Sequence, residues 1–329
     1  MASAARSVFR AEPYDYAAAR RIAASLELAE PVAVMLVRRG HRTVEEARAF
    51  MEARDEHDPS TFAGMEDVCE HVTVHGDYDV DGVTSTAILV STLRELGAEC
   101  DWLIPDRMGA GYGLSEASVA ELRRRGSELV ITVDCGITAV EEVAALREAG
   151  IDVVVTDHHE PPAELPDCPI LHPVVSGYPF SGLCAAGVAH KLSQALRRAA
   201  GLGDDGRAEL DLVALATVAD LVPLIGENRR LVRQGLLAMR SAPRPGLRAL
   251  MAVSRTDPES VDEQALGFRL APRINAAGRL YRADAGVELM LTDDAARATA
   301  IAAELDRANS ERRGAEQEVA TAAEAARRE

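Results

Sequence analysis

Apolar residues along this chain change from helical spacing to short continuous runs near residue 72, and this change predicts how the chain is organised. Before it, Tyr14–Ala29 and Pro31–Val37 carry apolar residues at helical spacing, and Thr43–Ala53 opens with a Thr-Val-Glu-Glu sequence typical of a helix cap. A break that contains proline and glycine follows. We expect residues 1–64 to form a helical segment packed on the rest of the chain.

Beyond residue 72, apolar runs of strand length alternate with helical patterns. This alternation indicates βαβ units, so the predicted fold class is α/β, with a mainly parallel sheet flanked by helices over residues 65–294. The predicted strands are Val72–His75, Glu99–Ile104, Leu129–Asp134 and Ile151–Thr156. The predicted helices are Val83–Leu96, Ser115–Arg125, a helix that Thr138 opens with Glu141 as its capping-box partner, Ala185–Ala200 and Glu209–Ala219.

The C-terminal residues 295–329 are rich in alanine and in charged residues at helical spacing, and the pattern ends without a closing cap. We interpret them as the start of a long connecting helix, and the missing cap favours a fragment of a longer protein over a natural short form.

Composition narrows the class of protein. With 47% hydrophobic and 27% charged residues, the chain has the profile of a soluble globular protein. No apolar run approaches the roughly 20 residues that span a bilayer, so we expect a cytoplasmic protein with no membrane partner. Five widely spaced cysteines without a CxxC pair argue against a disulfide framework and against a structural zinc site.

The formal net charge of −17 argues against a surface that coats nucleic acid generally, although a local basic groove remains compatible with it. Lys191 is the only lysine. Contacts with phosphate therefore have to come from arginine, whose planar guanidinium can bind a phosphate through two hydrogen bonds.

Side chains suited to divalent metals follow the predicted strands. HGDYDVDG (residues 75–82) comes at the end of the first strand, and DHH (residues 157–159) follows the fourth. In open parallel sheets, ligands bind outside the carboxyl ends of strands, near a switch in strand order. The side chains that we expect to converge there are His75, Asp77, Asp134 and Asp157.

The charge of these motifs predicts a pair of cations. Asp79 and Asp81 alternate on a segment that we take to be extended, where side chains two apart point the same way, so they can share two metals. Asp134 and Asp220 would complete the set. Four aspartates carry a charge of about −4, which two divalent cations balance, whereas without cations the carboxylates would repel one another and partly protonate.

Carboxylates with imidazole favour manganese first and magnesium second. The predicted chemistry is metal-assisted hydrolysis of a phosphoester, with His159 contacting the phosphoryl oxygens as charge develops on them. Asp157 is expected to orient the neighbouring imidazoles, and Asp77 to support the ligands from behind.

Each motif alone also has an ordinary structural explanation. An Asp-x-Asp after a strand is often a turn or a cap, and a His-His pair is usually structural. Only their joint occurrence with Asp134 and Asp220 favours a site. For His172, in Leu-His-Pro, we expect a surface or turn position.

Six segments carry a resemblance to a known family. They are, in chain order, HGDYDVDG, VDCGI, TDHHE, AAGVAHKL, DLVALATVADLVPLIGENRRL and APRINAAGR. Together they resemble the DHH phosphoesterase superfamily, and within it the RecJ single-strand-specific exonucleases, over almost the whole chain. APRINAAGR favours RecJ over the small oligoribonuclease branch.

The resemblance implies two manganese or magnesium ions and stepwise 5′-to-3′ release of mononucleotides from single-stranded DNA, in repair or recombination. Carried over by motif, the metal ligands would be His75, Asp79, Asp81, Asp134, His158 and Asp220. His159 would face the scissile phosphate, with Asp157 and Asp81 completing the catalytic set. The arginines implied as phosphate contacts are Arg279, near the 5′ end, and then Arg273 and Arg107.

The sequence departs from the RecJ pattern in two places. RecJ proteins normally continue into a second, substrate-binding domain that this sequence lacks, and residues 65–72 look shorter than the helix that usually precedes the first strand. We therefore expect the chemistry of the family, with the capture of long strands in question. Binding should be independent of base sequence and weakened by salt.

Two other functions stay open. One is a phosphodiesterase for short oligonucleotides or cyclic dinucleotides that uses the same metals. The other is a non-catalytic replication or repair scaffold, although such relatives typically lose metal ligands and every ligand position here is intact.

Overall fold

A computed structural model describes residues 14–58, 72–105, 113–203, 206–241, 244–280, 282 and 284–327. The chain divides into two compact units, Met1–Asp55 and Glu56–Glu329. The boundaries that we predicted at residues 64 and 294 remain predictions.

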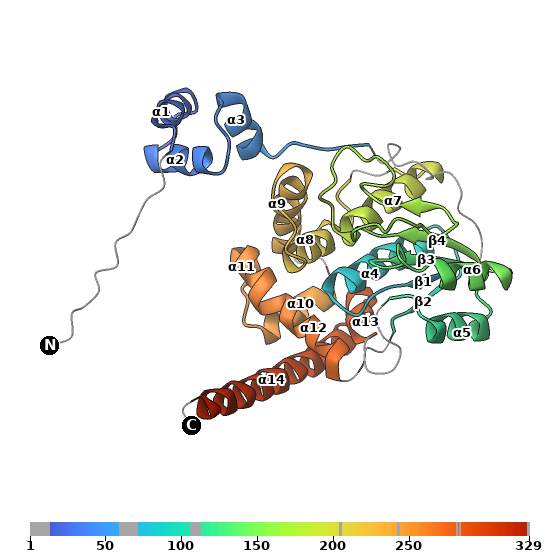
Figure 1. Ribbon diagram of the computed structural model, residues 1–329. Coiled ribbons are helices and arrows are strands. Elements are labelled where there is room, and N and C mark those ends of the chain that lie inside the picture. Colours follow the sequence, from blue (N-terminus) through green and yellow to red (C-terminus); the bar gives the residue numbers. More distant parts are fainter. Residues whose placement is uncertain are drawn as a thin grey trace. The chain divides into compact units, whose positions relative to one another are not determined.

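The described part of the first unit is helical, as predicted, with α1 (Tyr16–Ser25), α2 (Glu30–Arg38) and α3 (Val44–Glu52) (Figure 1). The predicted cap of α3 is a complete capping box. The backbone N–H of Glu46 donates to Thr43 Oγ1 over 3.1 Å, and the backbone N–H of Thr43 donates to Glu46 Oε2 over 3.0 Å.

The second unit begins with alternating strands and helices and ends in helices. The elements of its first half are β1 (Val72–His75), α4 (Val80–Glu95), β2 (Cys100–Leu103), α5 (Glu116–Arg125), β3 (Leu129–Val133), α6 (Val140–Glu148), β4 (Asp152–Thr156), β5 (Ile170–Leu171) and α7 (Ala185–Ala199). Those of its second half are α8 (Leu210–Ala219), α9 (Gly226–Arg240), α10 (Pro245–Val253), η2 (Pro258–Ser260), α11 (Glu263–Ala265), the π-helical η3 (Leu266–Leu270), α12 (Ala271–Leu280), α13 (Ala285–Leu291) and α14 (Ala295–Ala326).

Within the described residues, five strands form one parallel sheet in the order β2-β1-β3-β4-β5. The chain runs outward from β1 to β2 and then returns to β3 on the other side of β1. The strand order therefore switches between β1 and β3, where ligands of such sheets bind. The predicted α/β fold class is confirmed.

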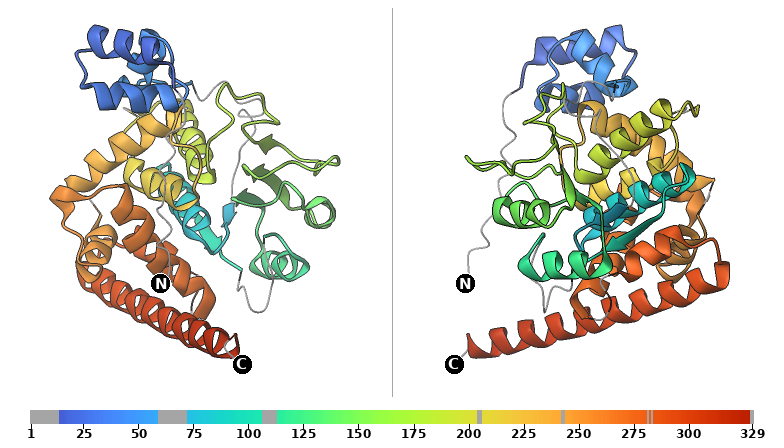
Figure 2. Two further views of the ribbon diagram at one scale, coloured as in Figure 1. Left: turned by 60° about the vertical axis from the view of Figure 1, so that its left-hand side comes forward. Right: turned by 90° about the vertical axis from the view of Figure 1, so that its right-hand side faces the viewer.

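Helices cover both faces of the sheet. Successive residues of each strand point to opposite faces, so each strand contacts the helices on both sides. Val130 and Val155 pack in one apolar cluster with α5 and α6, whereas Val74, Ile131 and Val154 belong to the larger cluster that includes α4 and α7 (Figure 2, left). Strands buried on both faces explain the continuous apolar runs of the sequence.

Two predicted helix starts are wrong. α4 begins at Val80 and not at Val83, because Asp79 caps it by accepting the N–H of Gly82 over 3.1 Å. Asp79 and Asp81 therefore lie at a helix start and not on an extended segment. α6 begins at Val140 without a side-chain cap, because Thr138 lies in a tight turn in which Ala139 N–H donates to Gly136 O.

At the end of the chain, α14 confirms the predicted C-terminal helix, whereas β5 and the helices from α9 to α13 were not predicted. Across the described ranges, we find no helix whose length and apolar character suit it to crossing a membrane.

A buried ionic cluster joins α4, α7 and α8. The guanidinium of Arg197 donates to Glu209 over 2.5 and 3.1 Å and also pairs with Glu95 at 2.8 Å. Nδ1 of His190 lies 3.8 Å from Glu209 Oε2, which is an ion-pair distance rather than a hydrogen bond. Burial alone would raise the pKa of Glu209, but the nearby His190 and Arg197 outweigh it and lower this pKa to about 2.

A carboxyl whose pKa is lower in the folded than in the unfolded state adds stability above its unfolded pKa, and this contribution is lost as the pH falls through the folded value. We therefore expect Glu209→Gln to cost roughly 2–3 kcal/mol at neutral pH and almost nothing near pH 2. Urea unfolding of both proteins across this range measures the gap, with the exposed Glu148→Gln as control. A gap that stays constant with pH would contradict the assignment.

Candidate metal centre

Polar side chains gather at the carboxyl ends of β1, β3 and β4. His75 ends β1, Asp134 directly follows β3, and Asp157 directly follows β4. The ends of β1 and β3 flank the switch in strand order, and the end of β4 lies beside it. The motif residues therefore lie where ligands bind in folds of this kind.

Three groups of side chains there have the composition of metal ligands, and within each group the ligand atoms lie within 4.8 Å of one another. The groups are Asp134, His158 and His159; Asp81, His158 and Asp220; and Asp77, Asp79 and Asp134. Asp134 and His158 each belong to two groups. The groups are therefore contiguous, as an arrangement for two adjacent cations requires.

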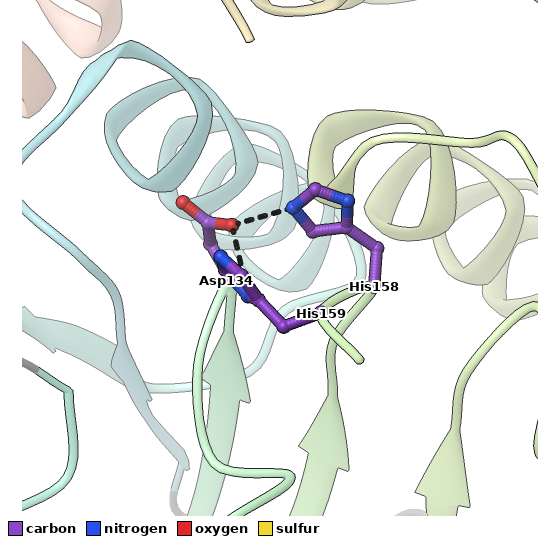
Figure 3. A group of neighbouring side chains, drawn as sticks. All are labelled: Asp134, His158 and His159. Carbon is purple, nitrogen blue, oxygen red and sulfur yellow. Dashed lines mark hydrogen bonds and ion pairs between the residues drawn. The ribbon is translucent and has the colours of Figure 1, made fainter. Parts of the chain in front are cut away.

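His158 lies at the centre of these groups. Its Nε2 is 3.1 Å from Asp134 Oδ1, 3.6 Å from Asp81 Oδ2 and 3.8 Å from Asp220 Oδ2. Figure 3 shows the imidazole of His158 turned toward the carboxylate of Asp134, and a second dashed line joins the same oxygen to His159. One imidazole thus faces carboxylates that come from three distant parts of the sequence.

Asp157 supports the DHH segment. Its Oδ1 accepts the backbone N–H groups of His158 and His159 over 2.7 and 3.2 Å, and its Oδ2 accepts the N–H of Ile137 over 3.0 Å. Oδ1 also pairs with His159 Nδ1 at 2.8 Å. Burial opposes the charge of Asp157, but these bonds outweigh it and lower its pKa, and the same pairing raises the pKa of His159.

Asp81 is held by the N-terminus of α7. Its two carboxylate oxygens accept the backbone N–H groups of Ala185 and Ala186 over 2.7 and 2.8 Å. α7 has no side-chain cap of its own at Cys184, so Asp81 satisfies N–H groups that the helix leaves open. The orientation of this carboxylate is thereby fixed.

The carboxylates of the centre have raised pKa values, which indicates that their negative charges are not balanced by the protein. Burial, and then the charges of Asp81 and Asp79, raise the pKa of Asp134 well above its usual range. Burial, Asp220 and Asp79 raise the pKa of Asp81 to about 8, and burial with Asp79 raises that of Asp220 to about 6. Carboxylates forced together in this way are stabilised by divalent cations.

The imidazoles of His75 and His158 have lowered pKa values, which suits them to be metal ligands. Burial lowers the pKa of His75 and of His158 to about 4, so both rings are neutral at physiological pH. His75 is fully buried, and its Nε2 has no hydrogen-bond partner within the ranges that the structure describes. A buried nitrogen in this state fits a metal ligand, although His75 lies outside the three groups.

The backbone around the centre is constrained. Asp134 has a φ of +61° and Leu221, directly after Asp220, a φ of +60°, both in the left-handed region that residues other than glycine rarely adopt. A Cβ on Gly82 would lie 2.5 Å from the carbonyl oxygen of Asp77, so only glycine fits beside the Asp79–Asp81 turn.

The sequence missed two supporting residues. His172 opens a turn, which is one of the two expected positions, because the N–H of Ser176 donates to its carbonyl oxygen over 2.8 Å, but it is buried and not on the surface. Its Nε2 lies 2.7 Å from His159 O, while its Nδ1 accepts the N–H of Val174 over 3.1 Å. Asn275 accepts the N–H of Val80 over 3.0 Å and so ties α12 to the first turn of α4. APRINAAGR contained Asn275, but nothing in the sequence indicated its partner.

The three arginines predicted to bind phosphate remain predictions. Arg273 pairs with Asp306 of α14 at 2.8 Å and donates to Arg269 O over 2.6 Å. Arg279 lies on α12, but its side chain is outside the described part of the chain, and so is Arg107.

Comparisons with known proteins identify the family of this chain. Residues 71–217 match the family model described as "DHH family, N-terminal domain". The single-stranded-DNA-specific exonuclease RecJ of Bacillus subtilis (strain 168) is 43% identical over 302 residues, which are 87% of this chain and 38% of that protein. The chain spans less than half the length of the curated relatives it matches.

Solved structures give the same result. RecJ from Thermus thermophilus in complex with Mn²⁺ matches with a TM-score of 0.79 and 35% identity, over 93% of this chain and 45% of that one. A crystal structure of exonuclease RecJ bound to manganese matches with a TM-score of 0.73 and 40% identity, over 80% of this chain and 68% of that one. The predicted resemblance is confirmed.

Proposed function

Because this chain belongs to the DHH family, and within it to the RecJ proteins, we propose that it is the catalytic core of a metal-dependent exonuclease that removes mononucleotides from the 5′ end of single-stranded DNA. The observation that carries the proposal is the sharing of Asp134 and His158 among three contiguous ligand groups at the switch point of the sheet. The cytoplasmic location expected from the sequence stays a prediction.

Two divalent cations would be held here, with manganese as first choice and magnesium as second. Their ligands would be His75, Asp79, Asp81, Asp134, His158 and Asp220. The proposal is supported by the carboxylate-imidazole composition of the groups and by the relatives whose structures contain Mn²⁺ or Mg²⁺. When bound, such ions supply Lewis-acid activation of a water and of a phosphoryl oxygen.

The protein's own residues orient the substrate and stabilise charge. Because Asp157 engages Nδ1 of His159, Nε2 is the ring nitrogen that would donate to a phosphoryl oxygen, and the raised pKa keeps the imidazole available as a donor. The side chain of His159 is 44% exposed, so a substrate can reach it. Arg279 would hold a further phosphate near the 5′ end.

The test compares a 5′-labelled single strand with its 3′-labelled twin, each with manganese and with chelator. We expect manganese-dependent release of labelled mononucleotide from the first strand at once and from the second only after the rest has been degraded. Release that begins at the 3′ end, or that is unaffected by chelator, contradicts the proposal. A clear preference for dinucleotides over long strands would instead favour the phosphodiesterase alternative, and no metal-dependent turnover at all would favour the scaffold.

A further inference from the structure

A second concentration of functional side chains lies on α9. Arg229, Arg233 and Arg240 line one pocket of about 340 Å³. Spacings of four and seven residues at about 100° per residue place all three arginines on one face of the helix, over a length of about 16 Å. We call this the α9 arginine pocket.

The composition of the pocket suits an anion with apolar parts. Its other lining residues are Leu224, Val232, Leu236, Leu237 and Glu263. The lining thus includes three arginines and one glutamate in a chain whose net charge is −17, so arginines outnumber carboxylates in this lining. Leu237 is 57% exposed and offers an apolar surface at this pocket.

The pocket is close to the metal centre along the chain. Leu224 lines the pocket and lies four residues after Asp220, a member of the central ligand groups. Four residues span at most about 14 Å, so the loop between α8 and α9 joins the two sites over a short distance.

We propose that the α9 arginine pocket binds the phosphodiester backbone of the uncleaved part of a single strand, a few nucleotides beyond the scissile phosphate. This inference rests on the proposed function, because an exonuclease must hold the remainder of its strand while one nucleotide leaves. Guanidinium groups bind phosphates without reading bases, and the leucines offer an apolar surface to sugars or bases. The pocket thereby supplies the local basic surface that an acidic chain needs to bind DNA.

The first test measures binding, which requires no turnover. The double variant Arg233→Gln/Arg240→Gln changes two exposed positions on α9, and Arg123→Gln/Arg248→Gln changes two exposed arginines on α5 and α10 as a charge-matched control. Affinity for a 20-nucleotide oligo-dT is measured from 50 to 200 mM salt. We expect the α9 variant to bind at least about tenfold more weakly at low salt and its log–log salt slope to be smaller by about 1.4, or 0.7 for each lost phosphate contact.

The control variant should match the unsubstituted protein. An unchanged salt slope in the α9 variant, or an equal change in the control, overturns the proposal.

The second test separates this proposal from the function on which it rests. With manganese, the α9 variant should lose more activity on a long strand than on a dinucleotide, whose single phosphodiester is the scissile one and leaves no further phosphodiester for α9 to bind. Equal losses on both substrates overturn the pocket and leave the exonuclease intact. Failure of the unsubstituted protein on both substrates overturns the exonuclease, and the binding measurement still decides the pocket.

Discussion

Asp134→Asn is expected to lower metal-dependent hydrolysis by at least about 1,000-fold, equivalent to about 4 kcal/mol of transition-state stabilisation. Asp134 belongs to two of the three ligand groups, so its loss would weaken both of the proposed cation positions at once. Asparagine keeps the shape of the side chain but removes the charge that attracts the ions and half of its oxygen ligands.

The experiment combines kcat/KM at saturating manganese with the rise in Tm that manganese causes. The variant should lose most of both, since a ligand that binds only the folded state stabilises it. Asp152→Asn is the matched control, because Asp152 is exposed at the opposite end of β4. Activity within tenfold of the unsubstituted protein, together with a retained manganese shift, would remove Asp134 from the metal centre.

The strands and their ends could be predicted because their signals lie within short stretches of the sequence. A strand buried on both faces is an unbroken apolar run, and in a parallel sheet its carboxyl end lies on a known edge. Asp134 and Asp157 directly follow such runs, so their approach at that edge could be predicted without any contact being known.

Contacts between distant segments could not be predicted in this way. Asp81 accepts N–H groups from the start of α7, more than 100 residues away, and His172 holds the DHH segment through the carbonyl oxygen of His159. Backbone N–H and C=O groups are the same in every residue, so no side-chain pattern reveals which of them a distant side chain will bind. Asn275 escaped the sequence analysis for the same reason.

The two capping signals show that a local sequence pattern alone does not decide whether a helix cap forms. Thr43 and Glu46 form a capping box where a helix cap was predicted, whereas Thr138 and Glu141, for which a capping box was predicted, have the same spacing and form none. The second pair follows Asp134, whose left-handed backbone begins the turn at the metal centre. The geometry of the site there overrides the local preference for a cap.

α9 was missed because arginine obscures its apolar stripe. On α9, Leu231, Val232 and Met239 are buried at helical spacing, but Arg230 is buried among them at 5% exposure. Arginine can place its apolar stem in a core while its charged end finds a partner, so a simple division into polar and apolar residues misassigns it.

Lys191 is a second buried charge, and its contribution to the free energy of unfolding can be measured. Its side chain is fully buried, and Nζ lies 2.8 Å from Glu227 Oε1 and 2.9 Å from His57 O. Glu227 is fully buried as well and also accepts the hydroxyl of Tyr178 over 2.9 Å. Arg230 Nη2 lies 3.3 Å from the same carboxylate, so the loss of Lys191 would leave the buried Glu227 with one cationic partner in place of two.

We therefore expect Lys191→Met to lower the free energy of unfolding by about 3 kcal/mol, the low end for a broken buried pair, because Arg230 still compensates part of the charge. Lys191→Met with Glu227→Gln should be more stable than the single lysine variant, because the second change removes a buried carboxylate that has lost one of its two cations. The four proteins form a double-mutant cycle whose coupling free energy is read from urea unfolding. Additive losses, with a coupling below about 0.5 kcal/mol, would mean that the two charges do not depend on each other.

An ion pair on the surface, also formed by a residue of α7, provides the control. Arg198 pairs with Asp58 at 2.9 Å, with side chains 47% and 55% exposed. Arg198→Met should cost less than about 1 kcal/mol, because exposed charges keep their hydration when the partner is lost. Lys191 and Arg198 both lie on α7 and both contact the segment around residue 57, so a large loss for Lys191 and a small one for Arg198 would assign the difference to burial.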